Sequence, residues 1–246
     1  MNQNGNESIG ETVFENLPSR FAVAAKAATI KIREFPEVLG FVLAGSVANG
    51  TADEFSDLDF YIVTNGKERW RGCWLLEETP VEYFFNPAEF LHRTIQNDAA
   101  ALHMLANGVT IAAHPELEQL QILAREILSK PPVINPHDLE FMRFNTMECV
   151  LETRSAIATE AYTYILPQAL VFIVKAIYQT LRWWEVKPKS MLQDLRKRNP
   201  ELANMAKIVL ENSSREQQQM ALEALALVVT PLQSFEYESQ KQTVIE

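Results

Sequence analysis

The chain has 246 residues, of which 47% are hydrophobic and 22% charged, a composition that allows a sizeable folded core and excludes an intrinsically disordered chain. Its formal net charge is -10 at neutral pH. Proteins that hold a long nucleic acid usually carry a basic face, because phosphate contacts supply most of the affinity. The charge therefore argues against a polynucleotide partner and suits a small or cationic one.

No apolar stretch of the sequence reaches the roughly 20 residues that a membrane-spanning helix needs. The longest candidate, residues 165–177, is interrupted by Pro167 and Gln168 and carries Lys175. Residues 1–11 are polar and acidic, without the basic start and apolar core of a signal peptide. We therefore expect a cytoplasmic protein that has no membrane partner.

The chain contains two cysteines, Cys73 and Cys149, and both lie in apolar-rich segments. We expect buried, reduced thiols rather than a disulfide or a nucleophile. The sequence contains no pair of cysteines separated by two other residues and no histidine-rich cluster. A structural zinc site is therefore not predicted.

The first predicted elements follow a polar start, residues 1–16, which has little to bury and is expected to be flexible. Helical spacing of apolar residues then covers 18–35 and ends at Pro36. Short apolar runs rich in β-forming residues predict strands over 38–43, 58–63, 70–76, 81–85 and 109–113. Between the last two strands, a helical pattern covers 88–107.

Helical patterning dominates the rest of the sequence. The predicted helices cover 115–129, 138–164, 167–184, 200–210 and 215–229. The proline-rich run 131–136 is the clearest linker. The predicted fold class is α+β, with a small mixed β-sheet domain and flanking helices over 17–112, followed by an all-α helical domain over 113–246.

The dipeptide Gly45-Ser46 directly follows the first predicted strand. Glycine lets a ligand approach the backbone closely, and serine adds a hydroxyl group. If a short helix begins here, its free N–H groups complete an anion site suited to phosphate oxygens. Taken alone, a Gly-Ser pair is simply a turn.

Asp57 and Asp59 are two residues apart at the start of the second predicted strand. Alternate residues of a strand point to one face, so the two carboxylates project together. They repel one another unless a cation lies between them, and Mg²⁺ prefers such hard oxygen ligands. Glu82, inside a later apolar run, can join them if its strand is their neighbour. An isolated pair of this kind is usually a solvated strand end, so the combination carries the interpretation.

This combination resembles the signature of the polymerase-β-like nucleotidyltransferase superfamily: a buried strand, Gly-Ser, a spacer, Asp-hydrophobic-Asp, and a later acidic residue in a strand. The resemblance covers roughly residues 20–110. A helical domain behind such a head is similar to the aminoglycoside nucleotidyltransferase branch. The mixed-sheet domain is accordingly expected to be a nucleotidyltransferase domain.

The resemblance implies a transferase that moves a nucleoside monophosphate, AMP from ATP, to a hydroxyl of a small-molecule acceptor. The reaction would depend on Mg²⁺, with two ions bound at the site. Asp57, Asp59 and Glu82 would then be the catalytic residues and the metal ligands, with Glu82 either a ligand or the general base. Gly45 and Ser46 would bind the triphosphate. Some members of the branch carry a base and a phosphate-binding lysine on the helical domain; no residue here matches the base.

Lys175, within an apolar helical stretch, is either a lysine that reaches the surface or a cationic contact to the nucleotide phosphates. The basic stretch 187–198 is either a solvated helix face or a segment that closes over the triphosphate. Two other functions stay open. One is a nucleotidyltransferase that modifies a partner protein, as in toxin–antitoxin pairs, and the other is a nucleotide-binding module without turnover.

Overall fold

The computed structural model describes residues 13–232 and 237–239. The chain divides into two compact units, Met1–Lys130 and Pro131–Glu246, each with its own apolar core. Most of the start that was expected to be flexible, residues 1–12, lies outside the described residues. The two units are described separately.

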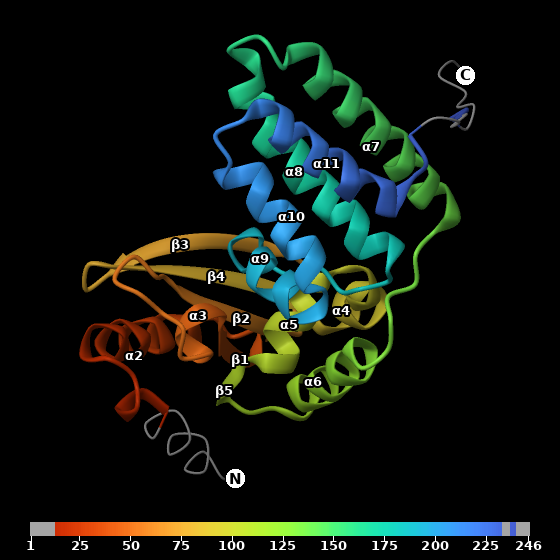
Figure 1. Ribbon diagram of the computed structural model, residues 1–246. Coiled ribbons are helices and arrows are strands. Elements are labelled where there is room, and N and C mark those ends of the chain that lie inside the picture. The colour runs from red at the N-terminus through yellow and green to blue at the C-terminus, as the bar shows by residue number, and fades with distance from the viewer. Residues whose placement is uncertain (1–12, 233–236, 240–246) are drawn as a thin grey trace, which may run out of the picture. The chain divides into compact units, whose positions relative to one another are not determined.

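The first unit is built on a five-stranded mixed sheet with the strand order β3-β4-β2-β1-β5 (Figure 1). Its strands are β1 (Val38–Ala44), β2 (Leu58–Thr64), β3 (Trp70–Leu76), β4 (Thr79–Pro87) and β5 (Val109–Ala112). β2 runs parallel to β4, whereas β1 is antiparallel to β2 and β5, and β3 is antiparallel to β4. All five predicted strands are present, because each carries enough apolar side chains to bury at least one face.

Both faces of the sheet centre are covered, which explains why every residue of β2 is buried. On one face, α2 (Ser19–Arg33) packs Phe21, Ala24 and Ile32 against an apolar cluster that includes Phe60 of β2. On the other face, helix α4 (Ala88–Thr94) packs on β4 and helix α5 (Ala99–Asn107) on β1. Leucines of these two helices are fully buried.

The single helix expected over 88–107 is instead two helices with a short 3-10 turn, Ile95–Asn97, between them. Asp98 is the reason, because its side chain accepts a hydrogen bond from the backbone N–H of Ala101 and so starts α5 as an N-cap.

Helix α6 (Pro115–Leu128) belongs to the first of the two compact units, which ends at Lys130. Its buried Gln121 explains this placement. The Gln121 amide nitrogen donates to the carbonyl of Leu105 at 3.2 Å, and its amide oxygen accepts from the Thr110 hydroxyl at 3.2 Å. These bonds join α6 to both α5 and β5.

The second unit is entirely helical in the part that the structure describes. Its helices are α7 (Pro136–Ala156), α8 (Ala161–Thr180), α9 (Pro188–Arg198), α10 (Pro200–Glu211) and α11 (Arg215–Val229). α8 is the central helix and buries nine of its residues, among them Tyr162, Ile173 and Tyr178. The mixed sheet with flanking helices and the helical second region together give the predicted α+β fold class.

One helix break in this unit was predicted wrongly, and one helix was left out of the predicted set. The chain breaks at residues 157–160 rather than before Pro167, because Arg215 of α11 donates to the carbonyls of Ile157 and Thr159 and holds them out of the helix. α9 was not among the predicted helices, although the basic stretch 187–198 was considered as a solvated helix face; α9 buries only Met191 and Leu195, so its apolar pattern is weak.

Because α8 continues through Pro167, it is long and apolar enough to cross a membrane by length and composition, in contrast to the expectation from the sequence. Half of its most apolar window is buried inside the unit, as in the core helix of a helical bundle.

Cys73 is exposed on the edge strand β3, contrary to the prediction of a buried thiol, and Cys149 is partly buried. β3 alternates between half-buried and exposed residues, and Cys73 falls on its exposed side.

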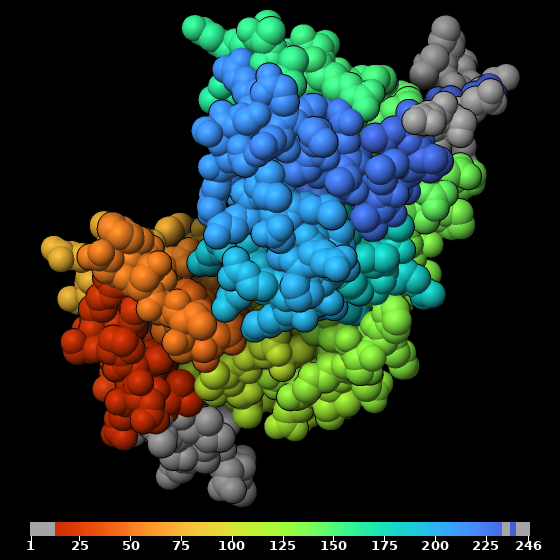
Figure 2. Space-filling view, in the orientation of Figure 1, coloured from red at the N-terminus to blue at the C-terminus, as the bar shows by residue number. Residues whose placement is uncertain are grey.

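The surface of the first unit also includes the loop before β2, which lies in the orange part of Figure 2. Phe55 in this loop is 86% exposed.

Candidate active site

The site begins where strand β1 ends. Ala44, its last residue, is the cross-strand partner of Asp59 on β2, and Asp59 is in turn the partner of Glu82 on β4. Cross-strand partners point to the same face of a sheet. One row across three strands therefore places the end of β1 beside two acidic side chains.

Gly45 opens the four-residue helix α3 (Gly45–Ala48) with a φ of 73°, a conformation that favours glycine. A Cβ atom at this position would collide with the carboxylate of Asp59. The predicted turn is thus present, and its glycine is required both by the backbone and by the neighbouring aspartate. α3 is too short to contribute a substantial helix dipole, so the predicted anion site would depend on backbone N–H and hydroxyl groups.

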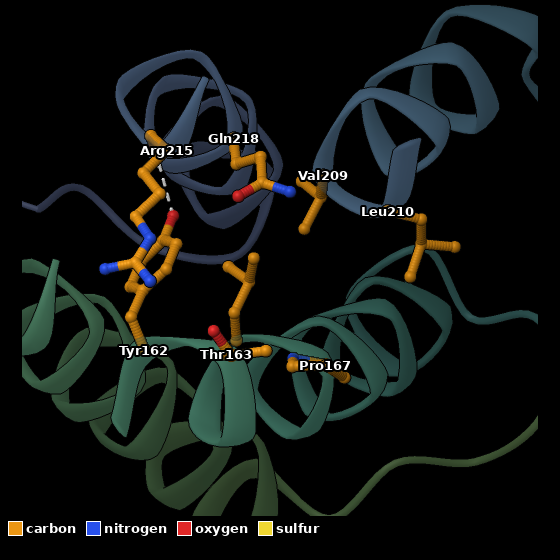
Figure 3. Close-up of a pocket in the computed structure, with 8 residues that line it drawn as sticks. Tyr162, Thr163, Pro167, Val209, Leu210, Arg215 and Gln218 are labelled. Atoms are coloured by element: carbon orange, nitrogen blue, oxygen red, sulfur yellow. Dashed lines mark hydrogen bonds between the residues drawn. The ribbon is translucent and has the colours of Figure 1, made fainter. Parts of the chain in front are cut away.

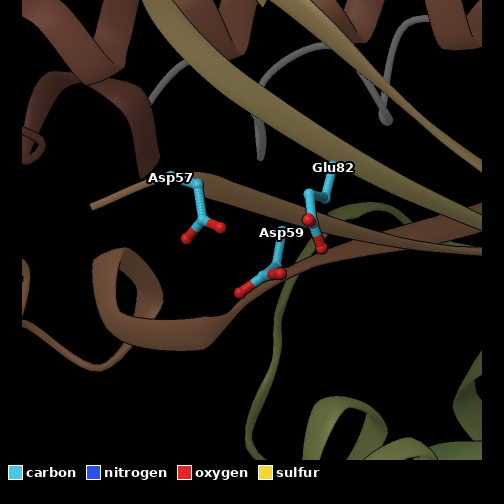
Figure 4. A group of neighbouring side chains, drawn as sticks. All are labelled: Asp57, Asp59 and Glu82. Atoms are coloured by element: carbon cyan, nitrogen blue, oxygen red, sulfur yellow. The ribbon is translucent and has the colours of Figure 1, made fainter. Parts of the chain in front are cut away.

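Asp57, Asp59 and Glu82 converge at the same end of the sheet. One carboxylate oxygen of each lies within 4.8 Å of the others. Figure 4 shows the three carboxylates on the same side of the strands, two from β2 and its start and one from β4. Asp59 is 2% exposed, whereas Asp57 and Glu82 are partly buried.

The loop that leads into Asp57 is fixed by hydrogen bonds. The Asp53 carboxylate accepts bonds from the Phe55 backbone N–H and the Ser56 hydroxyl, both at 2.9 Å. The Arg20 guanidinium of α2 donates to the carbonyls of Glu54 at 2.7 Å and Asp53 at 2.6 Å. Asp57 is therefore held by a tethered loop rather than by a free one.

Sequence reasoning did not identify this tether. The spacing Asp53-x-x-Ser56 is a turn pattern and could have signalled the local bonds. The contribution of Arg20 could not have been found, because it depends on α2 packing beside the loop.

The charge density of the trio favours a cation. Two unit charges about 4–5 Å apart repel by roughly 3–4 kcal/mol at an effective dielectric constant of about 20. A divalent cation with oxygen ligands relieves this repulsion, and carboxylate oxygens are its usual protein ligands. The donor set of Asp57, Asp59 and Glu82 therefore fits a hard divalent ion.

Ser46 supplies a second indication of a ligand. Its hydroxyl oxygen is buried and has no hydrogen-bond partner among the described residues. Buried polar atoms are normally paired, so an unpaired hydroxyl beside a glycine turn is a position for a ligand oxygen. The predicted role in binding a triphosphate stays a prediction.

Lys175, the other predicted nucleotide contact, lies on α8 in the second unit. It is partly buried and lines a shallow hollow together with Pro167, Gln168, Val171 and Phe172. Its role toward the nucleotide stays a prediction. In the basic stretch, Arg198 donates to Asp194 at 2.6 Å and lies over the Trp183 ring, so this residue contributes to the helical unit itself.

Tyr61 is a further residue of this face that sequence reasoning did not mark. It lies two residues beyond Asp59 on β2 and stacks on Phe84, its cross-strand partner on β4. Its hydroxyl is buried without a hydrogen-bond partner among the described residues. Burial raises the pKa of the Tyr61 phenol, the negative charge of Asp98 raises it further, and Arg69 opposes both. The Tyr61 phenol therefore stays neutral at neutral pH. Because residues two apart in a strand point to the same face, the alternation that placed Asp59 on this face could also have identified Tyr61.

A mixed sheet that brings three carboxylates together beside a Gly-Ser turn agrees with the nucleotidyltransferase signature that the sequence resembles. Residues 26–105 match the family described as "Nucleotidyltransferase domain". This part of the chain is a nucleotidyltransferase domain of the polymerase-β-like superfamily, and the general activity that it supports is nucleotidyl transfer. Membership of the aminoglycoside branch stays a prediction.

A solved structure of a nucleotidyltransferase-like protein from Exiguobacterium sibiricum 255-15 is similar to the chain at 15% sequence identity, with a TM-score of 0.46. The similarity covers 84% of this chain and 73% of that protein. No curated protein matches the sequence.

Proposed function

We propose that the chain is an Mg²⁺-dependent nucleotidyltransferase that moves a nucleoside monophosphate, AMP from ATP, to a hydroxyl of a small-molecule acceptor. The observation that carries the proposal is the convergence of Asp57, Asp59 and Glu82 within 4.8 Å beside Gly45 and Ser46. The acidic composition of the chain agrees with a small acceptor rather than a polynucleotide. A cytoplasmic location, where ATP and Mg²⁺ are available, is part of the proposal.

In the proposed reaction the acceptor oxygen forms a bond to the α-phosphorus of ATP. The bond between that phosphorus and the oxygen bridging to the β-phosphorus breaks, and pyrophosphate leaves. The hydroxyl proton passes to a general base or to water. Mg²⁺, when bound, supplies positive charge that neutralises the phosphate oxygens.

The residues of the chain would divide this work between them. Asp57, Asp59 and Glu82 would hold the ions, two in number, unless Glu82 is instead the general base. Gly45 lets a phosphate approach the backbone, and the Ser46 hydroxyl would donate a hydrogen bond to one of its oxygens. Lys175 would add a positive charge to the triphosphate site.

The test has a binding arm and an activity arm. Mn²⁺ would be titrated into the full chain and followed by electron paramagnetic resonance, and pyrophosphate release from ATP would be measured with a panel of hydroxyl acceptors that includes aminoglycosides. The double variant Asp57→Asn, Asp59→Asn should weaken Mn²⁺ binding by at least the roughly 10–100-fold that loss of an outer-shell partner costs. It should also release no pyrophosphate.

A matched control is Glu54→Gln, which removes one negative charge from the same loop at an exposed position. This variant should bind Mn²⁺ as the parent chain does. Pyrophosphate release that persists in the double variant would remove the two aspartates from the mechanism.

The outcomes also separate the two alternative functions. AMP-modified proteins found by mass spectrometry after co-expression would favour a protein-modifying enzyme. Tight ATP binding without pyrophosphate release for any acceptor would favour a module that lacks turnover.

A further inference from the structure

A pocket of about 190 Å³ lies within the second unit, between α8, α10 and α11 (Figure 3). It is lined by Tyr162, Thr163, Leu166, Pro167, Val209, Leu210, Arg215 and Gln218. None of these residues is among those proposed to bind the nucleotide or the metal ions, so the pocket has no ligand assigned to it so far. The volume equals the liquid volume of about six water molecules.

One side of the pocket is apolar. Leu166 and Val209 are buried members of the core of the second unit, and Pro167 and Leu210 form the adjacent rim. Leu210 is 47% exposed although it is a large apolar residue. This side offers a short hydrocarbon chain a surface without polar groups that would need pairing.

The other side carries a positive charge. Nη1 of Arg215 donates to the carbonyls of Ile157 at 2.9 Å and Thr159 at 2.7 Å, which fixes the guanidinium in place. Among the ion pairs of the described residues, none involves Arg215; the adjacent Glu216 accepts instead from the Ser214 hydroxyl at 2.8 Å. The Arg215 guanidinium therefore hydrogen-bonds to neutral carbonyls and lies over the Tyr162 ring, and its charge acts on the Glu216 carboxylate without a direct ion pair. An anion in the pocket could form that direct pair.

Two further polar groups border the pocket. Pro167 has no N–H, so the carbonyl of Thr163, four residues earlier in α8, lacks the usual helical donor. The side-chain amide of Gln218 extends into the pocket in Figure 3. An amide supplies both a donor and an acceptor, so Gln218 can bind an anionic oxygen beside Arg215.

We propose that this pocket binds a small organic anion, a monocarboxylate with an unbranched chain of about four to six carbons. The carboxylate lies between Arg215 and Gln218, and the chain lies against Leu166, Val209 and Leu210. The position of Tyr162 is preset, because its hydroxyl donates to the backbone carbonyl of Arg215 at 3.0 Å. The pocket therefore requires little rearrangement to accept the ligand.

The test is a nuclear magnetic resonance titration of the full chain with hexanoate, hexan-1-ol and hexylamine as probes. Hexanoate should produce saturable shifts at Thr163, Val209 and Gln218, with an affinity at least tenfold above that of hexan-1-ol. Hexylamine should produce none of these shifts. Equal affinities for the acid and the alcohol, or hexanoate shifts located elsewhere, would overturn the proposal.

Two variants sharpen the result. Thr163→Phe, at an exposed position on the rim, fills the pocket without entering the core and should weaken hexanoate binding at least tenfold. Leu227→Phe adds a similar ring at a residue of α11 that is 59% exposed and does not line the pocket, and should leave binding unchanged. Unaltered hexanoate affinity in Thr163→Phe would contradict the assigned pocket.

Discussion

At the scale of single residues, Gly45 and Gly50 share a positive φ, of 73° and 67°, but differ in their surroundings. A Cβ at Gly45 meets the Asp59 carboxylate, whereas a Cβ at Gly50 meets nothing within 4 Å. We expect Gly45→Ala and Gly50→Ala each to lose about 1–2 kcal/mol of stability through backbone strain. Only Gly45→Ala should also weaken Mn²⁺ binding, by at least about tenfold, because Asp59 must move.

Urea denaturation and Mn²⁺ titration of both variants would measure the two effects separately. Since Gly50→Ala carries the strain without the collision, it is the matched control. Equal Mn²⁺ affinity in the two variants would show that Asp59 is not a metal ligand.

A second expectation at this scale concerns pH. The Nε of Arg154 donates to a carboxylate oxygen of Glu223 at 2.6 Å, joining α7 to α11. This hydrogen bond lowers the pKa of the Glu223 carboxyl; burial opposes the shift, and a further bond from Gln219 assists it. Because the pKa is lower in the folded chain than in the unfolded one, the pair stabilises the fold above the unfolded pKa of about 4.3, and the contribution is lost as the pH falls through the folded pKa.

Arg154→Met should therefore cost about 0.5–1 kcal/mol at pH 7, a modest value because both side chains are partly exposed. The cost should be smaller near pH 3 than at pH 7, because Glu223 becomes protonated as the pH falls through its folded pKa, and urea denaturation at both pH values would measure the difference. Lys207→Met is the control, since its pair with Glu211 is longer, at 3.5 Å, and more exposed. A cost for Arg154→Met that is the same at pH 7 and pH 3 would assign it to packing instead of charge.

The sequence allowed part of the candidate site to be predicted. Alternation along one strand was enough to place Asp57 and Asp59 on a common face, because that property is local. Glu82 depended on which strand pairs with β2, and the parallel register with β4 is a long-range property that the sequence leaves open. The tether from Arg20 also depends on the packing of two elements and could not be predicted.

At the scale of elements, strands were predicted well and helix ends less well. Apolar β-forming runs bounded by turn residues identify strands directly. A helix end in the second unit was misjudged because Pro167 was interpreted as the first residue of a new helix. The burial of Leu166, Leu170 and Ile173 on the same helix outweighs the one hydrogen bond that the proline removes.

This explanation predicts the effect of Pro167→Ala. Proline in a helix interior costs up to about 3 kcal/mol relative to alanine, and the exposed position leaves room for the change. We expect the free energy of unfolding of the second unit to rise by about 1–3 kcal/mol, because the new N–H can bond to the Thr163 carbonyl. Urea denaturation followed by circular dichroism would measure it.

Pro136→Ala is a suitable comparison, because Pro136 is the first residue of α7, where no helical N–H is needed. It should change the stability by less than about 0.5 kcal/mol. If Pro167→Ala has no larger effect than this, the Thr163 carbonyl already has a donor.

At the scale of the whole molecule, the two units have separate cores. The chain between their last and first helices includes residues 131–135, which have no regular secondary structure. Val133 in this stretch is 93% exposed, which makes it a favourable site for proteolysis. The three acidic residues and the Gly-Ser turn all lie before the stretch. Metal binding is therefore expected to reside entirely in the first unit.

We predict that a fragment of residues 1–130 folds alone and binds Mn²⁺ within about threefold of the affinity of the full chain, a difference of about 0.7 kcal/mol. Circular dichroism and electron paramagnetic resonance would test folding and binding, and the Asp57→Asn, Asp59→Asn fragment would be the control for adventitious binding. A folded fragment that binds Mn²⁺ no better than this control would contradict a metal site that resides entirely in the first unit.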